Sequence, residues 1–170
     1  MIRPADVGDI TRLQEIEVAA GEMFRPLGMD LVADDDPITV DELRAYVEAG
    51  HVWVAWADDR ADAVGYLVLD VVDGAAHVEQ VTVHPQAARR GVGRALVEHV
   101  ASWAAAEGFA VMTLTTFVDV PWNAPYYERL GFRQLGPADE GQQLRRVRSE
   151  ERAHGLDAWP RVSMGRDLTA

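Results

Sequence analysis

The feature that most constrains this fold is a strand followed by a glycine turn and a helix, within residues 78–107. Val78 to Val83 is rich in β-branched residues, as in a buried strand. After a short loop, Gly91-Val92-Gly93 opens a helix whose apolar residues recur at helical spacing: Leu96, Val100 and Ala104. A helix start exposes about four unpaired N–H groups and the positive end of the dipole, and glycines let an anion approach the backbone. The turn is therefore a candidate cradle for a pyrophosphate.

The charge around this turn differs from that of the whole chain. Arg89, Arg90 and Arg94 crowd it, although the formal net charge is −12 and the sequence pI is about 4.7. A lone Gly-x-Gly is also common at ordinary strand-to-helix turns, so the glycines alone do not decide. A dinucleotide fingerprint needs a third glycine where Leu96 stands, and a P-loop needs lysine, which the chain lacks. A coenzyme A type of cradle remains.

The segments on either side of this unit predict the fold class. Val-, Trp- and Tyr-rich segments at 51–57, 63–72 and 76–83 are expected to be strands joined by tight turns at Asp58-Asp59-Arg60 and Asp73-Gly74. Further strands are expected at 2–3, 111–116, 132–135 and 162–168, and further helices from Ile10, after the capping box Thr39/Glu42, at 121–130 and at 142–154. This order predicts an α/β (mixed α+β) fold. We expect one domain over residues 1–170, with a central mixed, mostly antiparallel sheet of about six or seven strands and helices on both faces.

The composition excludes several classes of function. The chain has no cysteine, which excludes disulfides, thiolate nucleophiles and sulfur-ligated zinc. A His-Glu-x-x-His zinc motif is also absent, and we expect no metal. The acidic charge makes nucleic acid an unsuitable partner. Because neither a signal-like N-terminus nor a bilayer-length apolar run occurs, we expect a cytoplasmic protein without membrane contact.

Two motifs together carry a resemblance to a known family. The segment VEQVTVHPQAARRGVGRALVEHV, followed by PYYERLGF, resembles the core of the GNAT N-acyltransferase superfamily. That family carries Arg/Gln-x-x-Gly-x-Gly/Ala after its fourth strand, which Gly91 and Gly93 match, and a later Tyr-x-x-Leu-Gly-Phe, which residues 127–132 match. The first family position falls on Ala88, so Arg89 or Arg90 is expected to replace the lost contact. The resemblance implies acetyl-CoA as the co-substrate.

The same resemblance implies which residues bind the coenzyme. In the family, the backbone of the fourth strand pairs with the pantetheine chain and the thioester carbonyl, and its free N–H groups stabilise the oxyanion. Asn123 takes the coenzyme role of an asparagine that the family often places seven residues before the tyrosine, although it lies four before Tyr127 and Val120 stands at seven. The implied coenzyme-binding residues are Val81, Thr82, Val83, Arg89, Arg90, Gly91, Val92, Gly93, Arg94 and Asn123.

Direct attack of an amine on the thioester, as the resemblance implies, needs a base and an acid. Family members often carry an acidic residue four or six positions before the residue matched by Val83; these positions are Glu79 and His77. We expect Glu79 to deprotonate the ammonium, with His77 as the alternative base. The other possibility is that both residues only line a polar rim and take no part in catalysis. Tyr127 matches the tyrosine that protonates the leaving thiolate, as a phenol with a pKa of about 10, close to that of a thiol. The alternative is a buried tyrosine that packs against Phe132.

The acceptor is expected to be a primary amine of a small molecule or peptide. The acidity of Glu22 and Asp34 to Asp36 would suit a cationic amine, but a solvated turn ahead of the capped helix is the preferred interpretation of the aspartates. The charged helix at 142–154 is interpreted as a solvated face, and we expect a monomer or a homodimer. A non-catalytic acyl-CoA sensor on the same fold is the alternative function. A serine hydrolase is discounted because no serine lies in a Gly-x-Ser-x-Gly setting.

Overall fold

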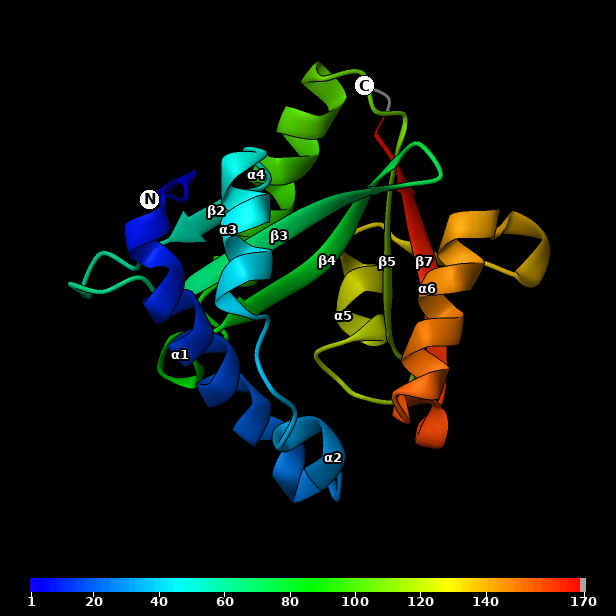
Figure 1. The fold of residues 1–170 in the computed structure, drawn as a ribbon, viewed down its shortest axis with the longest axis horizontal. Coiled ribbons are helices and arrows are strands. Elements are labelled where there is room, and N and C mark those ends of the chain that lie inside the picture. The colour runs from blue at the N-terminus through cyan, green and yellow to red at the C-terminus, as the bar shows by residue number, and fades with distance from the viewer. Residues whose placement is uncertain (169–170) are drawn as a thin grey trace. The chain divides into compact units, whose positions relative to one another are not determined.

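A computed structural model describes residues 1–168 of the chain (Figure 1). The strands are β1 (Ile2–Pro4), β2 (Val52–Ala55), β3 (Gly65–Val72), β4 (Ala75–Val83), β5 (Val111–Phe117), β6 (Arg133–Gln134) and β7 (Arg161–Asp167). The α-helices are α1 (Ile10–Gly21), α2 (Asp30–Ala33), α3 (Val40–Glu48), α4 (Val92–Ala106), α5 (Ala124–Arg129) and α6 (Gln142–Ala153). Short 310 helices cover Val7–Asp9, Glu22–Leu27, Pro85–Ala87, Pro137–Asp139 and Leu156–Ala158.

The strands form a seven-stranded sheet in the order β1-β2-β3-β4-β5-β7-β6. Pairing is antiparallel between β1 and β2, β2 and β3, β5 and β7, and β6 and β7, whereas β4 and β5 run parallel. The sheet is thus mixed and mostly antiparallel, which confirms the predicted fold class.

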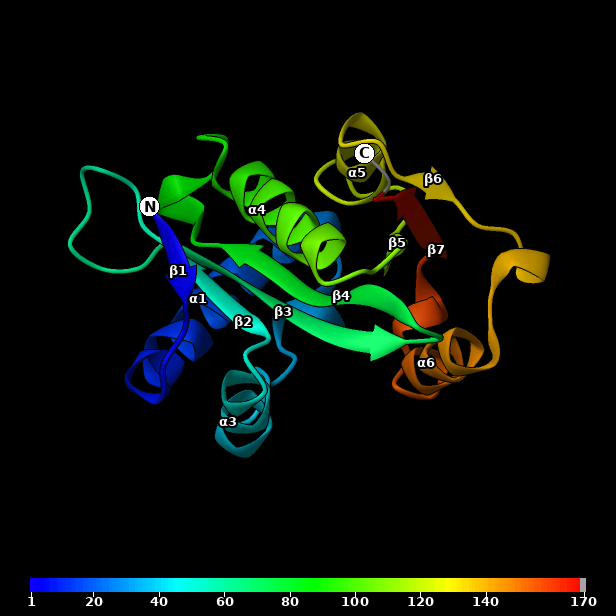
Figure 2. The ribbon, with the colours of Figure 1, turned by 90° about the horizontal axis from the view of Figure 1, so that it is seen from above.

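The chain divides into two compact units, which are described separately. The first contains residues 1–69 and 79–100, and the second contains residues 70–78 and the chain from Ala101 onward. In the first unit, α4 lies on one face of the strands and α1 and α3 lie on the other (Figure 2). In the second unit, α5 and α6 lie on opposite faces of β5 and β7 (Figure 2). The expectation that residues 1–170 form one domain stays a prediction.

The core of the first unit follows from the apolar stripes of α1 and α3. Ile10, Leu13 and Ile16 of α1 are buried and cluster with Leu43 of α3 and with Val52, Val54, Ala63, Tyr66 and Val68. The predicted capping box at the start of α3 is confirmed: the backbone N–H of Glu42 donates to the Thr39 hydroxyl, and the Glu42 carboxylate accepts from the Thr39 N–H.

A glycine fixes how closely β3 approaches α4 in the first unit. A Cβ added at Gly65 would lie 3.1 Å from the Thr82 carbonyl oxygen, 3.1 Å from Val92 Cγ1 and 3.3 Å from Leu96 Cδ1. Any side chain at this position would therefore press against the end of β4 and the first turn of α4. Gly65 thus helps to set the position of the predicted coenzyme turn.

The second unit holds α6 through hydrogen bonds to two acidic side chains, Asp73 and Glu151, which the sequence did not reveal. Asp73, in the β3–β4 turn, accepts from the backbone N–H groups of Gln143 and Leu144 and so caps the start of α6. Glu151 of α6 accepts hydrogen bonds from Thr115 of β5 and Arg161 of β7. The interpretation of this helix as only a solvated face is therefore wrong for its inner side, where the Glu151 side chain is 17% exposed.

Two local predictions differ from the structure. Glu22 to Ala33 contains a 310 helix and α2, neither of which was predicted from the sequence. The connection between β2 and β3 is not a tight turn, because it runs from Trp56 to Val64. In the described part of the chain, no helix has the length and apolar character needed to cross a membrane. The cytoplasmic location stays a prediction.

Candidate active site

The glycine turn forms the start of α4 in the first unit. The carbonyl of Gly91 accepts the first helical hydrogen bond, from the N–H of Ala95 at 2.9 Å, so the N–H groups before Ala95 have no partner inside the helix. The first turn carries no acidic residue that would oppose an anion. Gly91 has a φ of +81° with open space around a would-be Cβ, so its backbone conformation, and not crowding, is what favours glycine.

The three arginines of this turn differ in their partners. Arg90 forms a two-pronged ion pair with Asp59, with its Nη2 2.9 Å from Asp59 Oδ1 and its Nη1 3.3 Å from Asp59 Oδ2. Arg89 and Arg94 are exposed and form no ion pair within residues 1–168. The charges of Arg89 and Arg94 are thus not compensated by an ion pair in the described chain, whereas the charge of Arg90 is compensated by Asp59.

The contacts to the β2–β3 connection were missed by the sequence analysis. Besides the pair between Asp59 and Arg90, Arg60 Nη1 donates to Gln86 Oε1 at 3.1 Å. In the sequence, the run Asp58-Asp59-Arg60 indicated only a turn. Its contacts lie 26 and 31 positions away along the chain, a separation that no local pattern encodes.

The end of β4 leads directly into this turn. Thr82 is buried, Val81 and Val83 are partly exposed, and the N–H of His84 donates to the carbonyl of Val64 at 2.7 Å. A pocket of about 450 Å³ borders the start of α4, with Arg90, Gly91, Val92 and Trp56 among the residues that line it. The coenzyme residues predicted at 81–83 and 89–94 therefore follow one another along a single strand, turn and helix start.

The two candidate bases lie in different surroundings on β4. His77 is 1% exposed, and its Nδ1 lies 2.9 Å from the hydroxyl of Thr113, its register partner on β5. Burial lowers the pKa of His77, and the charges of Glu151, Asp70 and Asp73 act in the opposite direction. Glu79, in contrast, is exposed. An exposed carboxylate can meet an incoming ammonium without first being uncovered.

Tyr127 is a buried tyrosine that packs against Phe132, as one of the two alternatives from the sequence expects, and its role as the acid stays a prediction. It lies in α5, is 8% exposed, and packs edge-to-face on Phe132 and on Tyr126, with ring centroids 5.8 and 5.5 Å away. Burial, and to a lesser degree the neighbouring Tyr126, raises the pKa of Tyr127 above its ordinary value. Burial therefore shifts the pKa of this phenol upward, away from the expected match to the pKa of a thiol.

Asn123 stands at the start of α5 in the second unit. Its carbonyl accepts from the N–H of Tyr127 at 3.0 Å, but its side chain makes no capping hydrogen bond. The side-chain amide is therefore not used to hold the helix.

The acidic residues considered for a cationic acceptor are partly neutralised. Arg25 donates to Glu22 at 2.9 Å and to Asp34 at 2.6 Å. These pairs lower the pKa of both carboxyl groups. Asp36 is exposed. No cluster of three or more potential metal ligands occurs among the residues that the structure describes.

Comparisons with known proteins agree with this architecture. Residues 13–132 match the Acetyltransferase (GNAT) family. Protein Rv2747 from Mycobacterium tuberculosis, solved with CoA, is 17% identical, with a TM-score of 0.74 and 99% coverage of each chain. The ribosomal-protein-S18-alanine N-acetyltransferase from Escherichia coli is 16% identical, with a TM-score of 0.67 and coverage of 100% of this chain and 94% of that one.

A longer protein also contains this fold. N-acetylglutamate synthase from Neisseria gonorrhoeae, complexed with coenzyme A and N-acetyl-glutamate, is 16% identical with a TM-score of 0.69. The match covers all of the present chain but only 35% of the synthase. At these identities, the structural likenesses show the fold.

Proposed function

Because the chain belongs to the acetyltransferase (GNAT) family, we propose that it is an N-acetyltransferase that moves an acetyl (acyl) group from acetyl-CoA to a primary amine. The observation that carries the proposal is the start of α4. Its N–H groups without a partner inside the helix, its first turn without acidic residues, and two nearby arginines without an ion pair in the described chain favour a pyrophosphate. The acceptor in this proposal is a small molecule or a peptide.

Acetyl-CoA is the co-substrate, and it would bind along the segment that runs from β4 into α4. The backbone of Val81–Val83 would pair with the thioester end, and the N–H groups of Gly91, Val92 and Gly93 would hold the pyrophosphate. Arg89 and Arg94 would add charge there, and they, rather than Arg90, would compensate for the missing side chain at Ala88. The solved relatives Rv2747 and N-acetylglutamate synthase contain coenzyme A, which supports this choice.

In the proposed reaction, an N–C bond forms to the acetyl carbon and the C–S bond breaks. Glu79 takes a proton from the ammonium, so that a neutral amine attacks. The leaving thiolate takes the proton of Tyr127, and the tyrosinate is reprotonated by the second proton, which the nitrogen loses as the amide forms. The raised pKa of this tyrosine keeps it protonated and able to donate. The exposure of Glu79 and the burial of His77 support Glu79 as the base.

The names of two proteins with the same fold support an amine as the acceptor. Two solved relatives carry names that refer to amines: one is a synthase of N-acetylglutamate and the other acetylates the alanine of a ribosomal protein. A strongly cationic acceptor gains little support from Glu22 and Asp34, since Arg25 already pairs with both.

The test is a titration of the protein with acetyl-CoA, with and without a panel of amines, read as heat and as released thiol. The panel should contain amino acids, short peptides and polyamines. Binding heat together with amine-dependent thiol release is the expected result. Heat without thiol release from any amine would instead favour the non-catalytic acyl-CoA sensor. The absence of both binding heat and thiol release would contradict the proposal.

A further inference from the structure

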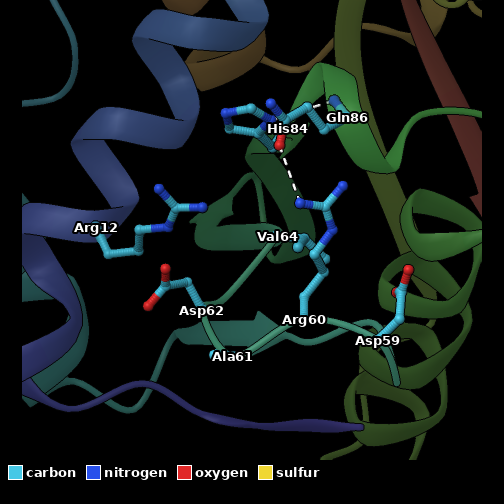
Figure 3. A pocket seen from close by; sticks show the side chains of 8 residues that line it. All are labelled: Arg12, Asp59, Arg60, Ala61, Asp62, Val64, His84 and Gln86. Atoms are coloured by element: carbon cyan, nitrogen blue, oxygen red, sulfur yellow. Dashed lines mark hydrogen bonds between the residues drawn. The ribbon is translucent and has the colours of Figure 1, made fainter.

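A second polar pocket of the first unit has a volume of about 420 Å³ and lies between α1, the β2–β3 connection and the residues after β4. Arg12, Arg60 and His84 contribute nitrogen-bearing side chains to its lining, and Asp62 contributes a carboxylate (Figure 3). Ala61 and Val64 supply its apolar surface. A volume of this order is sufficient for a small molecule.

The charges that line this pocket are unequally compensated. Arg12 pairs with Glu15 at 3.2 Å, and its Nε donates to the carbonyl of Ala63 at 2.9 Å. Asp59 points away from Asp62 in Figure 3 and is paired with Arg90. Arg60 and Asp62, however, form no ion pair with any residue of the described chain. The pocket therefore presents one uncompensated positive charge and one uncompensated negative charge.

His84 adds a donor beside the positive charge. Its Nδ1 accepts from the backbone N–H of Gln86 at 3.2 Å, so the neutral imidazole carries its proton on Nε2. Burial and the charges of Arg12 and Arg60 lower the pKa of His84, which favours this neutral form. The side of the pocket near His84 is thus rich in donors, and Asp62 supplies the acceptor.

We propose that this pocket binds a small zwitterion, namely a free α-amino acid with a short aliphatic side chain. The carboxylate would bind to Arg60 and His84, the ammonium would bind to Asp62, and the side chain would contact Ala61 and Val64. A simple anion would leave Asp62 uncompensated, and a simple amine would leave Arg60 uncompensated. The inference does not depend on the proposed acyl transfer, because it uses none of the residues assigned to that reaction.

The test is an NMR titration of the full chain without acetyl-CoA, observed at the methyl groups of Ala61 and Val64. The probes are L-alanine, propionate and ethylamine, of which the last two each lack one charged group of alanine. We expect saturable shifts with alanine and a dissociation constant in the millimolar range, about −4 kcal/mol at 1 mM. Propionate and ethylamine should bind at least about tenfold more weakly.

Two exposed variants and their controls complete the test. Arg60→Gln and Asp62→Asn should each weaken alanine binding at least about tenfold, while Arg44→Gln and Asp36→Asn, which make the same charge changes outside the pocket, should leave it unchanged. Equal binding of propionate and alanine would overturn the proposal, and so would shifts that persist in both pocket variants or an absence of saturable shifts.

Discussion

Glu79 and His77 stand two positions apart on β4, yet only one of them is open to solvent. His77 is enclosed and bonded to Thr113, whereas Glu79 is exposed. Burial favours a neutral imidazole, because transferring charge into the interior is costly. We therefore expect Glu79 to affect turnover and His77 to affect stability.

For Glu79→Gln, we expect kcat to fall about 10²-fold or more at neutral pH, because the amide cannot take the ammonium proton. The loss should shrink as the pH approaches about 10, where the amine supplies its own neutral form. Steady-state turnover against pH measures this, with the exposed Glu48→Gln as the matched control. Unchanged turnover across the pH range would rule out Glu79 as the base.

For Tyr127→Phe, we expect kcat to fall about 10²-fold, with acetyl-CoA binding retained. Phenylalanine keeps the edge-to-face packing on Phe132 but removes the donor for the thiolate. Thiol release and coenzyme titration measure the two effects, with Tyr126→Phe as the control. Full activity of Tyr127→Phe would show that this tyrosine serves only the packing of α5.

For His77, we expect a contribution to stability that depends on pH. Its pKa in the folded state lies below its ordinary value of 6.5, so the unfolded chain binds more protons between the two pKa values. The contribution is therefore present above pH 6.5 and is lost as the pH falls through that window.

Urea unfolding at pH 7 and pH 5 tests this expectation. The loss of unfolding free energy on acidification should be smaller in His77→Gln than in the wild type, and exposed His99→Gln should behave as the wild type does. An identical pH dependence in His77→Gln and the wild type would show that this buried histidine titrates as it does in the unfolded chain.

At the scale of elements, the start of α4 depends on contacts from two other segments of the first unit. Gly65 of β3 allows close approach, and the pair between Asp59 and Arg90 ties the turn to the β2–β3 connection. The ion pair is exposed, and pairs of this kind contribute only about 0–1 kcal/mol. Packing at Gly65 is therefore the stronger of the two constraints.

For Gly65→Ala, we expect a loss of about 1–3 kcal/mol in unfolding free energy and weaker binding of acetyl-CoA. The added Cβ would meet the Thr82 carbonyl and Val92 at 3.1 Å, and a backbone atom of the strand has little freedom to move aside. Chemical denaturation and coenzyme titration measure both effects. Gly136→Ala is the control, because a Cβ at Gly136 would meet Asp139 Oδ2 only at an ordinary contact distance of 4.0 Å and the residue has a φ of −79°. Unaltered stability and coenzyme affinity in Gly65→Ala would contradict the argument.

At the scale of the whole molecule, the net charge of −12 opposes the compact state through self-repulsion. Raising the ionic strength from about 0.01 to 0.15 M shortens the Debye length from about 30 to 8 Å and screens this repulsion. We therefore expect Tm to rise by about 2–4 °C for each kcal/mol gained. Thermal unfolding at increasing NaCl concentration and constant pH measures this change in Tm. A fall in Tm with salt would mean that the ion pairs outweigh the repulsion.

The element order could be predicted from the sequence because it depends on local patterns. Alternating β-branched residues indicated the strands, and the box of Thr39 and Glu42 indicated the start of α3. Gly91 has a positive φ, a backbone conformation that favours glycine, so the position of this turn could also be predicted from the sequence. The helical segments between Glu22 and Ala33 were missed, since they lack a strong apolar period.

The sequence by itself therefore determined the fold class, the family and the turn at the start of α4, because these rest on residues close together in the chain. Only the tertiary structure decided that Arg90 pairs with Asp59, that His77 is enclosed beside Thr113, and that Arg60 and Asp62 line one pocket. Burial and charge compensation depend on neighbours that are distant in sequence. The physical reason is that desolvation and Coulomb energies follow distances in space, which a linear pattern does not contain.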